Sequence, residues 1–310
     1  MSKNHILGNE GGRMKKKVIT RRDFLRVAAM STLAGAIPLP IGYAAKGEKA
    51  DKSRVVLIRD RDAVDSSDRH NPEVIQSMLD EAVTVLLDEK DPVEAWKKLV
   101  RPSDIVGIKS NVWSPISTGS AVEQAIKRRV MDAGVAEGNI GIADKGILRN
   151  TIFQNATALI NARPARTHHW SGMGTCIKNY IQFVPDPWSW HGDSCADLAK
   201  IWYLPHVKGK TRLNILVMLT PLFHGIGPHH YSKDYVWQYK GLLVSKDPVA
   251  VDATGVRILQ AKRKEFFGEE RPLQPPPKHI FVADTQHGLG NSHPDRIELI
   301  QLGWKEGILI

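Results

Sequence analysis

The sequence predicts an α/β fold: a mostly parallel β-sheet with helices on both faces and an irregular middle segment rich in Trp, His and Pro. Nearly continuous apolar runs mark buried strands at Arg54–Arg59, Ile105–Ile108 and Ile140–Ala143. Helical periodicities lie between these runs, and crossovers of that length join parallel neighbours. A parallel sheet is covered on both faces, which explains why its strands are apolar without alternation.

The helices of the first half are marked by how they begin. Asn71-Pro72 places an N-cap residue before a proline at the first helical position, and apolar residues then keep the helical period to Leu86. Asp91-Pro92 begins a shorter helix in the same way. A third helix is predicted over Ser120–Ala133, and Gly134 ends it.

The second half of the chain is less regular. Residues 164–235 form the irregular middle segment, and regular structure is expected to return within and after it. The expected elements are a helix from Pro248 and strands at Leu213–Leu219, Gly241–Val244, His279–Ala283 and Ile297–Leu302.

The N-terminal segment has the pattern of a twin-arginine signal: Arg21, Arg22, Phe24 and Leu25 stand before a short apolar stretch. That stretch, residues 27–37, is shorter than the roughly 20 residues that span a bilayer as a helix. Small residues around Ala44 allow cleavage after it. The alternative is that the leader is kept as an anchor.

These features predict three segments: a signal peptide at residues 1–44, a linker at 45–53 and one α/β domain at 54–310. The expected location is the periplasm or another extracytoplasmic space. The expected partner there is the twin-arginine translocation machinery, and membrane contact is expected only through the leader.

The charge distribution argues against nucleic-acid binding. The net charge is +10. Residues 1–44 hold eight basic and two acidic residues, which leaves 35 basic and 31 acidic residues in the remainder. Because the surplus beyond the leader is small and forms no stripe or motif, no nucleic-acid partner is expected.

Polar side chains follow several predicted strands. In α/β sheets, sites gather at the carboxyl ends of strands. These ends supply Asp60, Lys109 with Asn111, Asp144, and residues 284–287. Each aspartate could instead cap the turn that follows it. Lys109 is the more informative residue. Burying a charged amine at the end of a strand is costly, so it is expected to have a paired group or a functional role.

A second group of polar residues lies in the middle segment. Lys178, Asn179 and His191 are followed by a loop that contains His224, Gly227, Pro228, His229 and His230. Histidines near carboxylates could bind a divalent metal, for which His224, His229 and His230 are weak candidates. The zinc spacing His-x-x-x-His is absent. The alternative is that these are loop histidines packed against Trp188, Trp190 and Trp237.

Four further residues have two interpretations each. Asp247 is expected to cap the helix from Pro248 and could also bind a ligand, whereas Asp252, one turn further, could point into the site or out to water. Cys176 and Cys195 could form a disulfide or remain thiols. Two cysteines are too few for an iron–sulfur cluster, and the sequence identifies no cofactor.

Several motifs together resemble one known family. In chain order they are Val106–Asn111, Asn139–Asp144, Lys178-Asn179 with His191, Gly225–Pro228, Gly241–Asp252 and Gly288–Gly290. The chain resembles domain-of-unknown-function family 362 (DUF362) over about residues 54–302. This resemblance implies an α/β domain, often exported in this subgroup, and no settled reaction.

Two departures from the family pattern stand out. Some members carry ferredoxin-like cysteine clusters, which this chain lacks. Similar sequences often have an acidic residue in the strand before the Gly-Pro loop, whereas Val217–Leu219 is apolar here. The resemblance therefore implies that a ligand set using that acid is altered in this chain.

Two functions fit these observations. The first is an enzyme acting on a small polar or anionic ligand, with Lys109 or Lys178 as base or anion clamp and His191 as proton carrier. Its cleft would also contain Asn111, Asp144, Asn179 and Asp252. The second is a non-catalytic periplasmic binding or scaffold protein that holds a partner with the Trp-rich middle segment.

Overall fold

The computed structural model describes residues 52–225 and 227–310. The leader with Arg21, Arg22, Phe24, Leu25 and Ala44, and the linker up to residue 51, lie outside this part of the chain. The strands are β1 (Ser53–Arg59), β2 (Val106–Lys109), β3 (Ile140–Ala143), β4 (Ala158–His168), β5 (Gly172–Gly174), β6 (Thr211–Leu222), β7 (Gly241–Ser245) and β8 (Ile297–Gly303). The helices are α2 (Pro72–Leu86), α3 (Pro92–Lys97), α4 (Ser120–Asp132), α5 (Thr151–Asn155), α6 (Cys176–Asn179), α7 (Gly192–Cys195), α8 (Pro248–Phe267) and α9 (Lys278–Thr285).

The strands form one sheet in the order β3-β2-β4-β6-β7-β1-β8, with β5 paired to β4 outside this path. The pairs β2–β3, β2–β4, β4–β6 and β1–β8 are parallel. Strand β7 runs antiparallel to both of its neighbours, β6 and β1. The predicted mostly parallel α/β sheet is therefore confirmed, with β7 as the reversed strand of that path.

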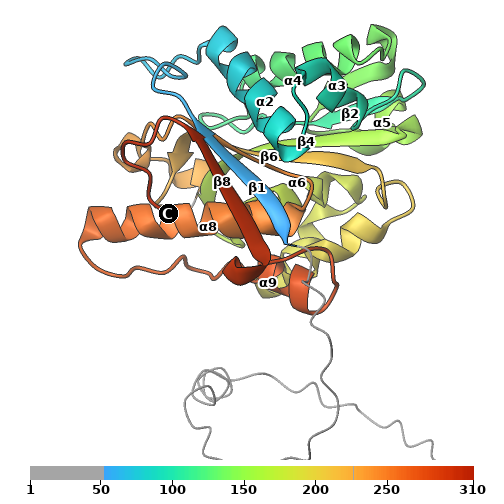
Figure 1. Cartoon of the computed structure of the whole chain (residues 1–310). Helices are drawn as coiled ribbons and strands as arrows, with labels where there is room; N and C mark the ends of the chain where they lie inside the picture. Colours follow the sequence, from blue (N-terminus) through green and yellow to red (C-terminus); the bar gives the residue numbers. More distant parts are fainter. Residues whose placement is uncertain (1–51, 226) are drawn as a thin grey trace, which may run out of the picture. The chain divides into compact units, whose positions relative to one another are not determined.

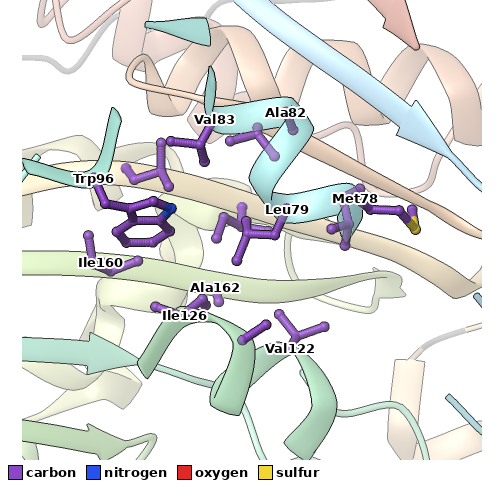
Figure 2. Packing of buried hydrophobic residues seen from close by; sticks show 14 of the residues in the cluster. Met78, Leu79, Ala82, Val83, Trp96, Val122, Ile126, Ile160 and Ala162 are labelled. Atoms are coloured by element: carbon purple, nitrogen blue, oxygen red, sulfur yellow. The ribbon is translucent and has the colours of Figure 1, made fainter. Parts of the chain in front are cut away.

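The sheet separates two layers of helices, as Figure 1 shows for α2, α3 and α4 on one side and α8 and α9 on the other. Alternate residues of β1 pack against the two layers of helices. Val56 and Ile58 pack with α2 and α4, whereas Val55 and Leu57 pack with α8. Figure 2 shows the first of these cores, in which Leu79 lies near Trp96 and Ile160. Burial on both faces explains why the strands lack alternation in the sequence.

The capping residues act as the sequence predicts. The Asn71 side chain accepts hydrogen bonds from the backbone N–H groups of Glu73 and Val74. The Asp91 side chain accepts one from Glu94 N. Each cap satisfies backbone donors that a helix start leaves unpaired. No helix within the described ranges has both the length and the apolar composition needed to cross a membrane.

Two elements differ from the predictions. Residues 279–283 belong to helix α9 and not to a strand, because a short apolar run fits either element and only its packing decides. The central strand β4 was not predicted, since Pro164 stands in the middle of it. A proline removes a ladder donor, and the register of β4 against β6 indeed shifts between Pro164 and Arg166.

Candidate active site

A pocket of about 410 Å³ opens at the carboxyl ends of β2, β3 and β4. Its wall is formed by polar side chains on the sheet side and by aromatic side chains from the following loops. The lining residues are Asn111, Trp113, Asp144, Arg163, Arg166, His168, Trp170, Lys178, Asn179, Ile181, Gln182, Pro187, Trp188 and His191.

Behind this wall, a buried ion pair joins the ends of β2 and β3. Lys109 Nζ lies 2.7 Å from Asp144 Oδ1 and also donates to the Ser110 carbonyl. Asp144 Oδ2 accepts from Val112 N. Burial lowers the pKa of Lys109 to about 8, while Asp144 and its hydrogen bond act in the opposite direction. Burial also opposes ionisation of Asp144, but Lys109 outweighs it and the pKa of that carboxyl is lowered. At neutral pH the pair is therefore charged on both sides.

The Asn179 amide, on α6, connects this pair to the centre of the sheet. Its Nδ2 donates to Asn161 Oδ1 over 2.9 Å and to the Lys109 carbonyl over 3.1 Å. Its Oδ1 accepts from Lys109 Nζ over 3.3 Å and lies 3.5 Å from Asn111 Nδ2. The structure thus brings together Lys109, Asn111, Asp144 and Asn179, which sequence reasoning had assigned to one cleft.

Strand β4 contributes two buried arginines, Arg163 and Arg166, which are 4% and 2% exposed. Within the described chain, neither forms an ion pair with a carboxylate, and the Nε of each lacks a hydrogen-bond partner. Arg166 Nη1 donates to the Ile116 carbonyl at 2.6 Å. Burial is the main cause that lowers the pKa of both groups. Both arginines line the pocket, and the Nε–H group of each is free to donate a hydrogen bond.

Lys178 and His191 also line the pocket, and their side chains contact each other. Lys178 Nζ lies 2.9 Å from His191 Nε2 and 3.9 Å from Cys195 Sγ. Burial lowers the pKa of Lys178 to about 7, and nearby Arg163 lowers it further against the attraction of Cys195. Burial and the charge of Lys178 lower the pKa of His191 to about 4. His191 is therefore neutral at pH 7, and Lys178 titrates near it.

A group of aromatic rings lines the pocket beside His191. The His168 ring lies nearly parallel to that of His191 with centroids 6.2 Å apart, and Trp170 lies 4.3 Å from His191. Trp188 packs edge-on against Trp170 at 4.7 Å. Burial, followed by the charge of Lys178, strongly lowers the pKa of His168. Since His168 Nδ1 accepts a hydrogen bond from Trp170 N, the neutral ring carries its proton on Nε2.

Asp252 lies inside the molecule and does not line the pocket, which corrects its assignment to the cleft. Its carboxylate oxygens each accept a backbone N–H at 2.8 Å, from Cys176 and Ile177. These groups begin α6, the helix that carries Lys178 and Asn179. Burial raises the pKa of Asp252 to about 7 against these hydrogen bonds. Asp252 therefore holds the start of the helix that carries Lys178 and is not part of the pocket wall.

Asp247 is also outside the pocket. It caps α8 as predicted, accepting from Val249 N and Ala250 N, and it also accepts from Asn291 N. Strand β7 is antiparallel to its neighbours, so its carboxyl end, where Asp247 stands, lies at the opposite edge of the sheet from this pocket. The predicted ligand-binding role of Asp247 stays a prediction.

The other two aspartates at expected strand ends also have local partners. The Asp60 carboxylate accepts from Asp62 N in a turn. Asp284 belongs to α9 and binds Ser292 and Arg296. Asp60 acts as the capping alternative predicts, whereas Asp284 joins its helix to the later Ser292 and Arg296. Neither residue lines the pocket.

The histidine loop is not part of the pocket wall. His224 Nδ1 accepts from Arg263, and the ring packs against Tyr235 and Phe267 rather than against the expected tryptophans. His230 is exposed, and the side chains of Pro228 and His229 are not among those that the structure describes. Within the described part of the chain, no group of three or more His, Cys, Asp or Glu side chains is placed to hold a metal ion.

Gly227 is also absent from the pocket lining, although its backbone packs against the end of β4. It has φ +83°, and a Cβ there would lie 2.7 Å from the Thr167 carbonyl, next to His168. Both the backbone conformation and the close approach therefore require glycine.

The two cysteines are buried free thiols, so the possible disulfide is not formed. Cys176 packs with β1 and α8, whereas Cys195 packs in a separate core with Tyr180. The residues Val217–Leu219 of β6, where similar sequences often have an acid, are core side chains. They offer no ligand to the pocket.

Sequence reasoning missed the two arginines, His168 and the three tryptophans of the wall. Arg163, Arg166 and His168 lie on the unpredicted strand β4. The two arginines on either side of Pro164-Ala165 were the available signal. Trp113 comes from a loop and Trp188 from the short 3-10 helix Pro187–His191, and no periodicity predicts the position of either.

Comparison with known proteins identifies one family over part of the chain. Residues 145–257 match the model of the domain of unknown function DUF362. This match includes Arg163, Arg166, Lys178 and His191, and it begins just after Asp144. No curated protein and no solved structure matches the chain. The predicted resemblance is confirmed over the matched residues.

Proposed function

We propose that this chain, which contains a DUF362 domain over residues 145–257, is an enzyme that binds a small anion and transfers a proton with Lys178. The observation that carries the proposal is the pair Arg163 and Arg166. Both are buried at the pocket wall, and neither has a carboxylate partner among the described residues. An anionic ligand would supply that partner.

The energetics of buried charge support an anion in this place. A buried ion costs several kcal/mol in desolvation unless an opposite charge compensates it. Asp144 is the acid of the pocket wall, and Lys109 already neutralises it. The two guanidinium groups thus lack a paired carboxylate, which a bound carboxylate or phosphate could supply with bidentate hydrogen bonds.

The surroundings of Lys178 support proton transfer. A general base works best when its pKa lies near the operating pH, and the pKa of Lys178 is lowered to about 7. A proton taken from the bound ligand would make the amine an ammonium group, which keeps its hydrogen bond to His191 Nε2. His191 is half-buried and offers a route for that proton to solvent.

The tryptophans also favour a small ligand. Trp113, Trp170 and Trp188 line the pocket beside the charged groups. The Trp-rich segment that suggested a macromolecular partner therefore contributes walls to a cavity. An apolar wall with a few convergent polar groups is typical of small-molecule sites.

We also propose that the chain is exported through the twin-arginine route, as Arg21 and Arg22 with the following residues indicate. The enzyme would then act in an extracytoplasmic space. This proposal depends on the leader alone and is independent of the pocket.

The anion proposal is tested by thermal unfolding of the full chain with and without phosphate, sulfate or citrate. At an anion concentration of 100 times Kd, the native state should gain about 3 kcal/mol by mass action. Arg163→Met and Arg166→Met should lose this gain while the ligand-free protein keeps or raises its melting temperature, because each removes an uncompensated buried charge.

The matched control is Arg69→Met, which changes an exposed arginine that does not line the pocket. It should keep the full response to the anion. An equal response in the wild type and in both pocket variants would contradict the proposal.

A further inference from the structure

The hydrogen bonds around Lys178 define the direction of its lone pair. His191 Nδ1 lies 3.2 Å from the Trp188 carbonyl, and a carbonyl only accepts, so the proton of the neutral ring is on Nδ1. His191 Nε2 is therefore an acceptor and receives a hydrogen bond from Lys178 Nζ at 2.9 Å. A second N–H of Lys178 points to Cys195 Sγ at 3.9 Å.

These two contacts occupy both N–H bonds of a neutral lysine amine. The lone pair of the nitrogen is then directed to neither His191 nor Cys195, and Lys178 is one of the residues that line the pocket. Lys178 as a residue is 2% exposed, so few water molecules compete for that lone pair. This is the arrangement that a nucleophilic lysine requires.

Burial and the two arginines favour the neutral form of Lys178, and Cys195 acts against them. Arg163 and Arg166 are positive, and His168 and His279 are buried neutral rings on neighbouring elements. No ion pair with a carboxylate holds Lys178 within the described residues, in contrast to Lys109, which pairs with Asp144 at 2.7 Å. The pocket therefore contains one nucleophilic amine next to an anion clamp.

We propose that Lys178 forms an imine with a small carbonyl compound that carries an anionic group, such as a 2-oxo acid. The amine attacks the carbonyl carbon, the resulting carbinolamine loses water, and the C–O bond is replaced by a C=N bond. One amine and one carbonyl give one imine and one water, with no oxidant or reductant. This inference rests on the proposed anion-binding function and names its substrate class.

The geometry of the pocket fits that class. The anionic group would bind Arg163 and Arg166, while the carbonyl carbon lies against Lys178. The neutral His168 ring carries its proton on Nε2 and lines the same pocket, so it can donate a hydrogen bond to the carbonyl oxygen and polarise the carbonyl. The two protons of the released water are the two that the amine nitrogen gives up.

The experiment is borohydride trapping on the full chain. The protein is incubated with pyruvate or glyoxylate, reduced with sodium borohydride, digested and mapped by mass spectrometry. We expect one added group per chain on the peptide that contains Lys178, in at least tenfold excess over any other lysine. Lys109, which is buried and paired, is the internal control and should stay unmodified.

Two further measurements separate this inference from the anion proposal. Arg163→Met should reduce the labelling of Lys178 at least tenfold at the same pyruvate concentration, because the anion no longer orients the carbonyl. A thermal shift with pyruvate but no label on Lys178 would overturn the imine and leave anion binding intact. Neither a shift nor a label with any of the probe anions would overturn both.

Discussion

Replacing Asp144 with Asn is expected to leave Lys109 as a buried cation without its carboxylate. The pair is joined at 2.7 Å, and Lys109 is 0% exposed, so water cannot take the place of the lost charge. Lys109 is therefore expected to become neutral in the folded variant. The variant should be less stable, and its deficit should depend on pH.

The magnitude follows from the pKa values. Lys109 has a pKa of about 8 in the folded protein and 10.5 when unperturbed. Below pH 8 the wild-type lysine is charged in both states, so this group adds no pH dependence there. In Asp144→Asn the folded state lacks that proton, and each pH unit below 8 costs about 1.4 kcal/mol. The deficit should be about 1 kcal/mol at pH 7 and about 3 kcal/mol at pH 6, within the range for a broken buried pair.

The assay is urea unfolding of wild type and variant at pH 6, 7 and 8, with the denaturant slope checked for two-state behaviour. The matched control is the double variant Lys109→Met with Asp144→Asn, which removes both charges. It should lie within about 1 kcal/mol of the wild type and show no extra pH dependence. A deficit of Asp144→Asn that stays constant from pH 6 to 8, or grows as pH rises, would refute the reasoning.

Two other predictions concern the anion clamp and export. In Gly174→Ala the new Cβ would lie 2.9 Å from the guanidinium of Arg163, so we expect a folded protein with at least tenfold weaker anion binding by calorimetry. Gly138→Ala, which meets no atom within 4 Å, is the control and should bind normally. Replacing Arg21 and Arg22 together with Lys should retain the protein in the cytoplasm with its leader uncleaved, as cell fractionation would show. Unchanged delivery of that variant would contradict the twin-arginine prediction.

Much of the fold could be predicted because capping and apolar pattern agree along the first half of the chain. Asn71 and Asp91 cap the helices they were expected to cap. The two elements that were predicted wrongly or missed also have a physical explanation. Residues 279–283 are apolar enough for a strand, and only their packing against the rest of the chain makes them helical. Strand β4 tolerates Pro164 at an irregularity of its register, which no local pattern reveals.

For the site, the strand-end rule succeeded only where the strands are parallel. Lys109 and Asp144 follow β2 and β3, which are parallel neighbours, and their side chains meet. Asp247 follows β7, whose reversed direction places the residue at the other edge of the sheet. Strand direction depends on pairing between distant segments. Without the sheet order, the sequence therefore cannot predict at which edge of the sheet a strand-end residue lies.

The two lysines of the site illustrate how the same residue type acquires different chemistry. Lys109 and Lys178 are both buried, and desolvation lowers the pKa of each. Lys109 faces a carboxylate and remains a cation, so its charge is used to hold Asp144 and the loop at Val112 N. Lys178 faces a neutral imidazole and a thiol, neither of which stabilises an ammonium group as a carboxylate does. The group that each lysine contacts, rather than its burial, therefore decides whether its amine is neutral and can act on a ligand.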